Sequence, residues 1–230
     1  MEKVADFVVK NVESDQDVTL SSFWADGPVI IYFLRRFGCQ ICRWQSKNVS
    51  QLAAPLDGKN VRFVAIGPER LGWEEFVNGK FWTNTDVFYD PERKLYQELG
   101  LKRSGLLGVF GGMLTKKTWD MVGKTRSAGV TGNLKGDIYQ LGGLFVVDKG
   151  GDKILYEFRQ ADFNDYPDVQ AIAKSLGVEY TPPPESVQPV CNSESCTLPN
   201  ATTDGAPKCD AGGSCGIAEQ KQPDGEAAKS

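Results

Sequence analysis

Two cysteines in the stretch RRFGCQICRW, Cys39 and Cys42, are separated by two residues in a chain that holds six cysteines. Arg35 and Arg36 come just before this pair, and Arg43 follows it directly. Cysteines at this spacing serve as half of a zinc site, as a structural pair or as a redox dithiol. Neighbouring cations lower the pKa of a thiol, and the thiolate is the reactive form.

The sequence contains no histidine. A Ser-His-Asp triad, a Cys-His pair and imidazole ligation of a metal are therefore excluded. A nucleophilic cysteine must instead be activated by cations or by a helix N-terminus. A zinc site would need two more ligands, and the other four cysteines are spaced more widely than zinc ligands usually are. Those four are Cys191, Cys196, Cys209 and Cys215, and the sequence leaves their role open.

The chain has 230 residues, a net charge of -4 and a pI of about 5.1. A general nucleic-acid partner is not expected, because phosphate binding needs a concentrated basic face. The first residues are acidic rather than basic and apolar, so no secretory signal is expected. No apolar run reaches the length of a transmembrane segment. We therefore expect a cytosolic protein, a setting in which thiols stay reduced and paired cysteines are catalytic or metal-binding.

The composition changes near Gly177. Residues 1–177 carry regularly recurring apolar segments and are predicted to form one domain. Residues 178–230 are rich in Pro, Gly, Ser and charged residues and hold four cysteines. This tail is predicted to be disordered, because it has too little apolar surface to offset the entropy of ordering it.

Three neighbouring segments predict where the cysteine pair lies in the fold. Pro28–Arg36 is a nearly continuous apolar run, which predicts a strand buried on both faces. Apolar residues from Cys39 to Leu56 recur at helical spacing, and Val61–Gly67 reads as a second buried strand. The pair therefore falls where a buried strand turns into a helix. At that point a helix dipole adds about half a positive charge.

The remaining elements follow in order along the chain. A short helix, a short strand and a helix are expected at Trp73–Gly79, at Asp86–Asp90 and from Pro91. A hairpin at residues 142–160 and a closing helix from Pro167 come last. Between them, Gly108–Asp137 is expected to be an irregular glycine-rich connection. It is interpreted either as a lipid-binding loop beside the cysteines or as a packed surface excursion.

Alternation of strands and helices predicts an α/β sandwich, and the late antiparallel hairpin makes its central sheet mixed. This is the thioredoxin-like arrangement. Open α/β sheets place their sites at the carboxyl ends of strands, where the cysteine pair lies. A redox pair is therefore favoured over a zinc site and over two inert cysteines. Gly38 is expected to line the site, and only one of Arg35 and Arg36 is expected to face the sulfurs, because strand side chains alternate.

Four segments of the chain carry a resemblance to a known family. In order, they are LRRFGCQICRW, LAAPLDGKNVRFVAIGPERLG, YQELGLKR and GNLKGDIYQLGGLFVVDKGGDKILYEF. They resemble the prostamide/prostaglandin F synthase branch of the peroxiredoxin-like (AhpC/TSA-type) proteins, from about Val18 to Gly177. The resemblance implies an oxidoreductase that reduces the 9,11-endoperoxide of prostaglandin H2, or of its ethanolamide, to the F-type product. It implies catalytic roles for Cys39 and Cys42 and no bound cofactor. Electrons would come from NADPH through thioredoxin reductase and thioredoxin.

Two alternatives remain beside this function: a general thiol peroxidase for hydrogen or lipid peroxides, and a redox-switched binding protein. In either enzyme a thiolate attacks one peroxide oxygen and forms a sulfenic acid. Condensation with the second thiol then gives a disulfide and water. Arg35, Arg36 or Arg43 would supply positive charge to the released alkoxide. Thioredoxins expose the first cysteine, whereas peroxiredoxins place the attacking cysteine last in this turn. The peroxide chemistry therefore favours Cys42 as the attacking residue.

Overall fold

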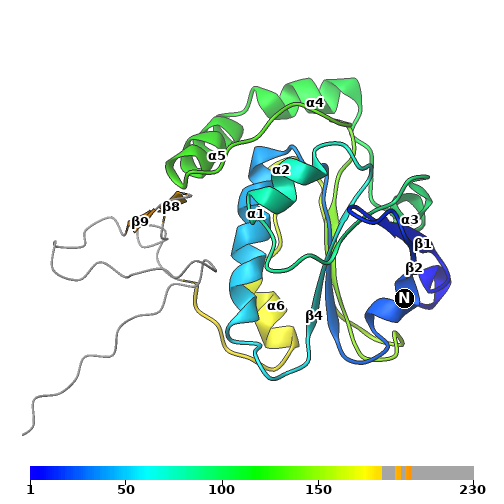
Figure 1. Cartoon of the computed structure of the whole chain (residues 1–230). Helices are drawn as coiled ribbons and strands as arrows, with labels where there is room; N and C mark the ends of the chain where they lie inside the picture. The colour runs from blue at the N-terminus through cyan, green and yellow to red at the C-terminus, as the bar shows by residue number, and fades with distance from the viewer. Residues whose placement is uncertain (183–189, 193–194, 198–230) are drawn as a thin grey trace, which may run out of the picture. The chain divides into compact units, whose positions relative to one another are not determined.

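The computed structural model describes residues 1–182, 190–192 and 195–197. Residues Met1–Pro182 form one compact unit built around a seven-stranded sheet in the order β2-β1-β5-β4-β3-β6-β7 (Figure 1). β3, β4 and β5 run parallel, and β1, β6 and β7 pair antiparallel with their neighbours. The strands are β1 (Val8–Asn11), β2 (Asp17–Thr19), β3 (Val29–Phe33), β4 (Arg62–Gly67), β5 (Val87–Tyr89), β6 (Gly143–Val147) and β7 (Ile154–Arg159).

Helices cover the two faces of this sheet. The α-helices are α1 (Gln40–Ser50), α2 (Trp73–Asn78), α3 (Lys94–Glu98), α4 (Leu106–Met113), α5 (Lys116–Ser127) and α6 (Val169–Ser175). Short 3-10 turns are η1 (Glu2–Val4), η2 (Leu20–Phe23) and η3 (Gln51–Ala53). In the described part of the chain, no helix combines the length and apolar character that a membrane span needs.

The central strand β3 is buried on both sides because its side chains alternate between two cores. Ile30 and Tyr32 pack with residues of α1, α2 and α6. Ile31 and Phe33 pack with α3 and the N-terminal segment on the opposite face. This two-sided burial explains the continuous apolar run in the sequence, and it confirms the predicted α/β sandwich with a mixed sheet.

The region Gly108–Asp137 differs from the prediction, since it contains helices α4 and α5 instead of an irregular connection. The glycines in this region make a helix difficult to predict from the sequence, because each interior glycine costs a helix roughly 1 kcal/mol relative to alanine. Other features outweigh this cost in α5. Thr115 caps its N-terminus by accepting a hydrogen bond from the Thr118 N–H at 3.3 Å, and Met121 and Thr125 bury one face. Figure 1 shows both helices in green above α1 and α2.

The N-terminal strands β1 and β2 were not predicted, because strands of four and three residues leave too short an alternation to detect. The predicted domain end at Gly177 falls inside the compact unit, which runs to Pro182. The Tyr180 hydroxyl donates a hydrogen bond of 2.8 Å to Gln51, and this contact holds the extension.

Residues Pro183–Ser230 form a second unit. In the described part of it, β8 (Val190–Asn192) and β9 (Ser195–Thr197) pair antiparallel, with Cys191 opposite Cys196. Cys209 and Cys215 lie outside the described residues, and for the rest of the tail disorder stays a prediction.

Tyr96 joins β3 and β4 at their carboxyl ends, the end of the sheet where the cysteines lie. Its buried hydroxyl lies 2.7 Å from the Leu34 carbonyl oxygen and 2.8 Å from that of Ile66. The Ile66 oxygen also accepts from the Leu34 N–H at 2.8 Å. The tyrosine therefore fixes the backbone that leads from β3 into the cysteine turn.

Tyr96→Phe should lower the free energy of unfolding by about 1–3 kcal/mol, because a buried carbonyl loses its donor. Urea denaturation followed by fluorescence measures this change. Tyr166→Phe is the matched control, since Tyr166 is exposed and surface changes usually stay within about 0.5 kcal/mol. Equal stability of the two variants would show that the Tyr96 hydroxyl does not stabilise the carboxyl ends of β3 and β4.

Candidate active site

Helix α1 begins directly after Cys39, which occupies the N-cap position. Its backbone is extended there, and its sulfur accepts a hydrogen bond of 3.3 Å from the Cys42 N–H. Serine, threonine and aspartate usually fill this role with an oxygen. A thiolate at this position accepts an otherwise unpaired N–H and lies at the positive end of the helix dipole. The start of α1 therefore stabilises negative charge on Cys39.

The two sulfurs lie 2.6 Å apart, and both cysteines are buried free thiols. A hydrogen bond from the Cys42 thiol lowers the pKa of Cys39 to about 5, and Arg35, Arg36 and the Cys42 N–H act in the same direction against burial. Burial raises the pKa of Cys42 well above its usual value, and so does its hydrogen bond to Cys39. Within the pair, the thiolate is therefore favoured on Cys39 and the proton on Cys42.

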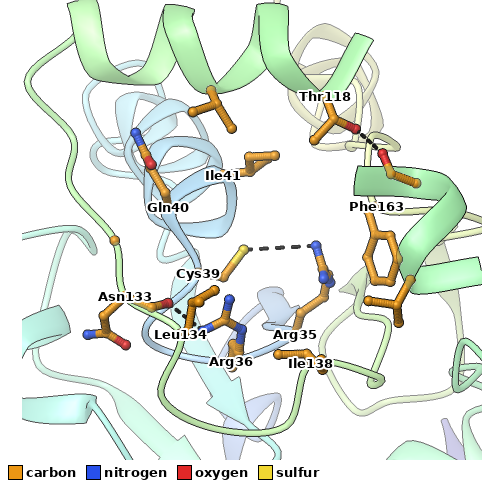
Figure 2. Close-up of a pocket in the computed structure, with 14 residues that line it drawn as sticks. Arg35, Arg36, Cys39, Gln40, Ile41, Thr118, Asn133, Leu134, Ile138 and Phe163 are labelled. Atoms are coloured by element: carbon orange, nitrogen blue, oxygen red, sulfur yellow. Dashed lines mark hydrogen bonds between the residues drawn. The ribbon is translucent and has the colours of Figure 1, made fainter. Parts of the chain in front are cut away.

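Arg35 is the cation that reaches the sulfur. Its Nη1 lies 4.0 Å from the Cys39 Sγ, and its Nε donates to the Gln140 carbonyl oxygen at 3.4 Å. The guanidinium also stacks 4.0 Å above the ring of Phe163. These partners hold a buried positive charge beside the thiolate (Figure 2).

Arg36 lines the same cavity but mainly holds backbone. Its Nη1 donates to the Asn133 and Lys135 carbonyl oxygens at 2.5 and 3.0 Å, whereas its buried Nε has no hydrogen-bond partner. These carbonyls belong to a segment we call the strap, residues 130–137. The strap passes very close to Gly38, whose carbonyl oxygen accepts from the Asn133 N–H at 2.7 Å. A Cβ at Gly38 would lie 2.1 Å from the Asn133 Oδ1, so a side chain at Gly38 would displace the strap.

Arg43 does not reach the sulfurs, contrary to its expected role as a cation of the site. It lies one turn into α1, and its Nε donates to the Phe37 carbonyl oxygen at 2.7 Å. Its Nη1 donates to the Thr131 carbonyl oxygen of the strap at 3.0 Å, and its Nη2 pairs with Glu75 at 3.1 Å. Arg43 therefore positions the strap and the cysteine turn.

Glu75 joins α1 to the strap from α2. Hydrogen bonds from Lys135 and then Arg43 lower the pKa of its carboxyl to about 2, and Asn133 adds a third. The carboxylate therefore remains charged across the physiological range and balances the cations that surround the strap.

A cavity of about 440 Å³ opens beside Cys39. Arg35, Arg36 and Cys39 lie at one side of it, as Figure 2 shows. Its apolar lining residues are Ile41, Val109, Val122, Leu134, Ile138 and Phe163. Except for Ile41, these residues are remote in sequence from the cysteines, and no motif marks them. The only sequence signal is the apolar character of the glycine-rich connection, which supplies three of them: Val109, Val122 and Leu134.

Comparison with known proteins gives relatives over most of the chain. The AhpC/TSA antioxidant enzyme family matches residues 46–162, a range that begins after Cys42. The chain is 42% identical over 195 residues to a prostamide/prostaglandin F synthase from Xenopus tropicalis, and this match covers 85% of the chain and 96% of the relative. A protein of the same name from Sus scrofa is 37% identical with the same coverage.

Among solved structures, the chain resembles peroxidoxin BcpB from Mycobacterium tuberculosis with a TM-score of 0.50 and 16% identity. The match covers 76% of this chain and 91% of that one. At this identity the likeness concerns the fold alone, and it confirms the predicted thioredoxin-like class.

Alkylation of Cys39 by iodoacetamide should increase with pH around a midpoint near 5, because only the thiolate reacts. Arg35→Met removes the nearest cation and should raise this midpoint by about one unit, or about 1.4 kcal/mol. Mass spectrometry of the peptide that carries Cys39 and Cys42 gives the rate and the site.

Arg62→Met is the matched control. Arg62 lies on β4 opposite Val29, at the end of β3 that is far from the cysteines. Its midpoint should equal that of the wild type. A wild-type midpoint near the ordinary value of about 8.5 would contradict the activated thiolate.

Proposed function

This chain belongs to the AhpC/TSA antioxidant enzyme family and to its prostamide/prostaglandin F synthase branch, and we propose that Cys39 attacks the O–O bond of a lipid endoperoxide. Members of this family are thiol-dependent oxidoreductases, and this chain is one of them. We further propose prostaglandin H2 or its ethanolamide as the substrate, in line with the name of its relatives. The observation that carries the proposal is a thiolate beside a fixed arginine at the side of an apolar cavity.

The assignment of the attack to Cys39 reverses the sequence-based expectation of Cys42. Cys39 lines the cavity and lies at the helix N-cap, which favours its thiolate. Cys42 lies inside the first turn of α1 and keeps its proton. Cys42 therefore suits the resolving role, with its sulfur 2.6 Å from that of Cys39.

The chemistry of an endoperoxide differs from the expected release of water, because both oxygens stay bound to carbon. The Cys39 thiolate attacks one oxygen, an S–O bond forms, and the O–O bond breaks to leave an alkoxide. Cys42 then attacks the Cys39 sulfur, which forms the disulfide and releases the second oxygen. The thiol proton of Cys42 and one proton from solvent complete the diol. The dithiol is thereby oxidised and the endoperoxide reduced by two electrons.

Arg35 has a defined part in this sequence of steps. Negative charge moves from the Cys39 sulfur to the departing oxygen, and a fixed cation in a water-poor site stabilises such developing charge. The guanidinium is already held by Gln140 and Phe163, so it needs no reorganisation when the charge moves.

The disulfide must be reduced again after each turnover. We propose thioredoxin as the donor, recharged by thioredoxin reductase and NADPH, so that NADPH acts without binding to this chain. Exchange begins when a donor thiolate attacks one sulfur of the disulfide. Cys39 is the accessible choice for this attack, because it lines the cavity.

Cys39→Ser should abolish turnover, whereas Cys42→Ser should allow one attack and no disulfide. The test supplies prostaglandin H2 or hydrogen peroxide to protein with NADPH, thioredoxin and thioredoxin reductase. Intact mass spectrometry of the Cys42→Ser variant should show Cys39 carrying the whole lipid after prostaglandin H2, and one oxygen after hydrogen peroxide. An adduct at Cys42 in the Cys39→Ser variant would reverse the roles. No NADPH oxidation with any peroxide would overturn the enzymatic proposal.

Val122→Trp should separate a lipid endoperoxide reductase from a general peroxidase. Val122 lines the cavity, and a large ring there should exclude a lipid while a small peroxide still reaches Cys39. We expect kcat/KM to fall at least tenfold, about 1.4 kcal/mol, for prostaglandin H2 and to stay within about threefold for hydrogen peroxide. Val8→Trp is the control, because Val8 is exposed on β1. Equal losses for both substrates would favour the general peroxidase.

A further inference from the structure

We propose that the α4–α5 segment, residues 102–135, docks on an anionic lipid surface and so brings the cavity beside Cys39 to the membrane. The inference goes beyond the chemical step, and it holds whichever peroxide the thiolate reduces. It rests on exposed apolar side chains, on local charge and on the position of the cavity.

Apolar side chains gather on the outside of this segment. Leu106, Leu114, Trp119 and Leu134 are 58%, 80%, 63% and 77% exposed. They are half of the eight large apolar side chains that are exposed among the described residues. Scattered exposed apolar residues are ordinary, but four within 29 residues form a concentration that folding of the chain leaves unexplained.

The same segment is strongly basic. Between residues 102 and 135 the sequence has seven lysines and arginines and one acidic residue, Asp120, a net charge of +6. The whole chain carries -4, so its other residues carry -10. Arg103 pairs with Asp137 and Lys135 with Glu75, both outside this range. The segment still has an excess of cations, which orients the molecule in the field of an anionic surface.

Helix α5 has one side that faces the cavity and the core and another side that is exposed. Thr118 and Val122 line the cavity, and Met121 and Thr125 are buried. On the other side, Lys116, Trp119, Gly123 and Arg126 are exposed and recur at helical spacing. A tryptophan between cations is typical of helices that lie in the interface of a bilayer.

The same segment walls the cavity. Val109 of α4 and Val122 of α5 form part of its wall, and Figure 2 shows α5 passing over it. Leu134 both lines the cavity and is 77% exposed, so it lies at the rim. A lipid that leaves the bilayer at this surface would therefore reach the cavity past Leu134.

Charge also argues against a second copy of the chain as the occupant. A symmetric dimer through this surface would bring two basic segments together, because a two-fold interface pairs each patch with itself. An anionic bilayer supplies both the opposite charge and an apolar layer for the exposed leucines and Trp119.

Flotation of the full chain with phospholipid vesicles tests the inference. The wild type should float with vesicles that contain about 30% phosphatidylserine and not with pure phosphatidylcholine, and salt should weaken the binding. Leu114→Ser/Trp119→Ser and Lys116→Glu/Lys117→Glu should each weaken binding at least tenfold. Matched controls at other exposed sites, Val8→Ser/Ile154→Ser and Lys149→Glu/Lys153→Glu, should bind as the wild type does.

Three outcomes would overturn the inference: no binding to either vesicle, equal losses in the segment and control variants, or a wild-type dimer that Leu114→Ser/Trp119→Ser dissociates without any vesicle binding. The rate of Cys39 alkylation should be the same in all four variants, which shows that they are folded. Vesicle binding without turnover of any peroxide would support the docking surface while overturning the proposed enzyme function.

Discussion

The structure depends on the position of Cys39 at the N-cap of α1. A buried thiolate is stable only if the protein replaces the water it loses. The first turn of α1 supplies one backbone N–H, Cys42 supplies a thiol proton, and Arg35 supplies the countercharge. All three depend on β3, because this strand ends one short turn before the helix begins and thereby aims the helix N-terminus at the sulfur.

The three arginines near the cysteines make different contacts in the folded site, although they are neighbours in the sequence. Arg35 faces the sulfur, whereas Arg36 and Arg43 hold carbonyl oxygens of the strap. The strap carbonyls need donors because the segment is pressed against Gly38 and Gln40, where little space remains for water. Buried backbone oxygens without partners are costly, so Arg36 and Arg43 hold the backbone while Arg35 lies beside the Cys39 sulfur.

The α4–α5 segment connects the site to its surroundings. Its inner side forms cavity wall, and its outer side carries leucines, Trp119 and basic residues. With the proposed lipid substrate these two roles are complementary, because transfer from a bilayer to a distant pocket would expose the lipid to water. Leu134 lines the cavity and is exposed on the proposed docking surface, which would shorten that path.

The sequence by itself determined the sandwich, the strand-to-helix position of the cysteine pair and the need to activate a thiol by cations or a helix N-terminus instead of a histidine. These follow from local patterns: a continuous apolar run, helical periodicity, the spacing of two cysteines and the lack of histidine. Only the tertiary structure placed Cys39 at the N-cap beside the cavity and Arg35 next to its sulfur, because burial and hydrogen-bond partners differ between residues with nearly equal local sequence. The cavity also required the fold, since Val122 and Phe163 meet Cys39 only after α5 and the segment that follows β7 have packed against α1. Glycine-rich sequence concealed α4 and α5, whose stability comes from packing and capping more than from local propensity.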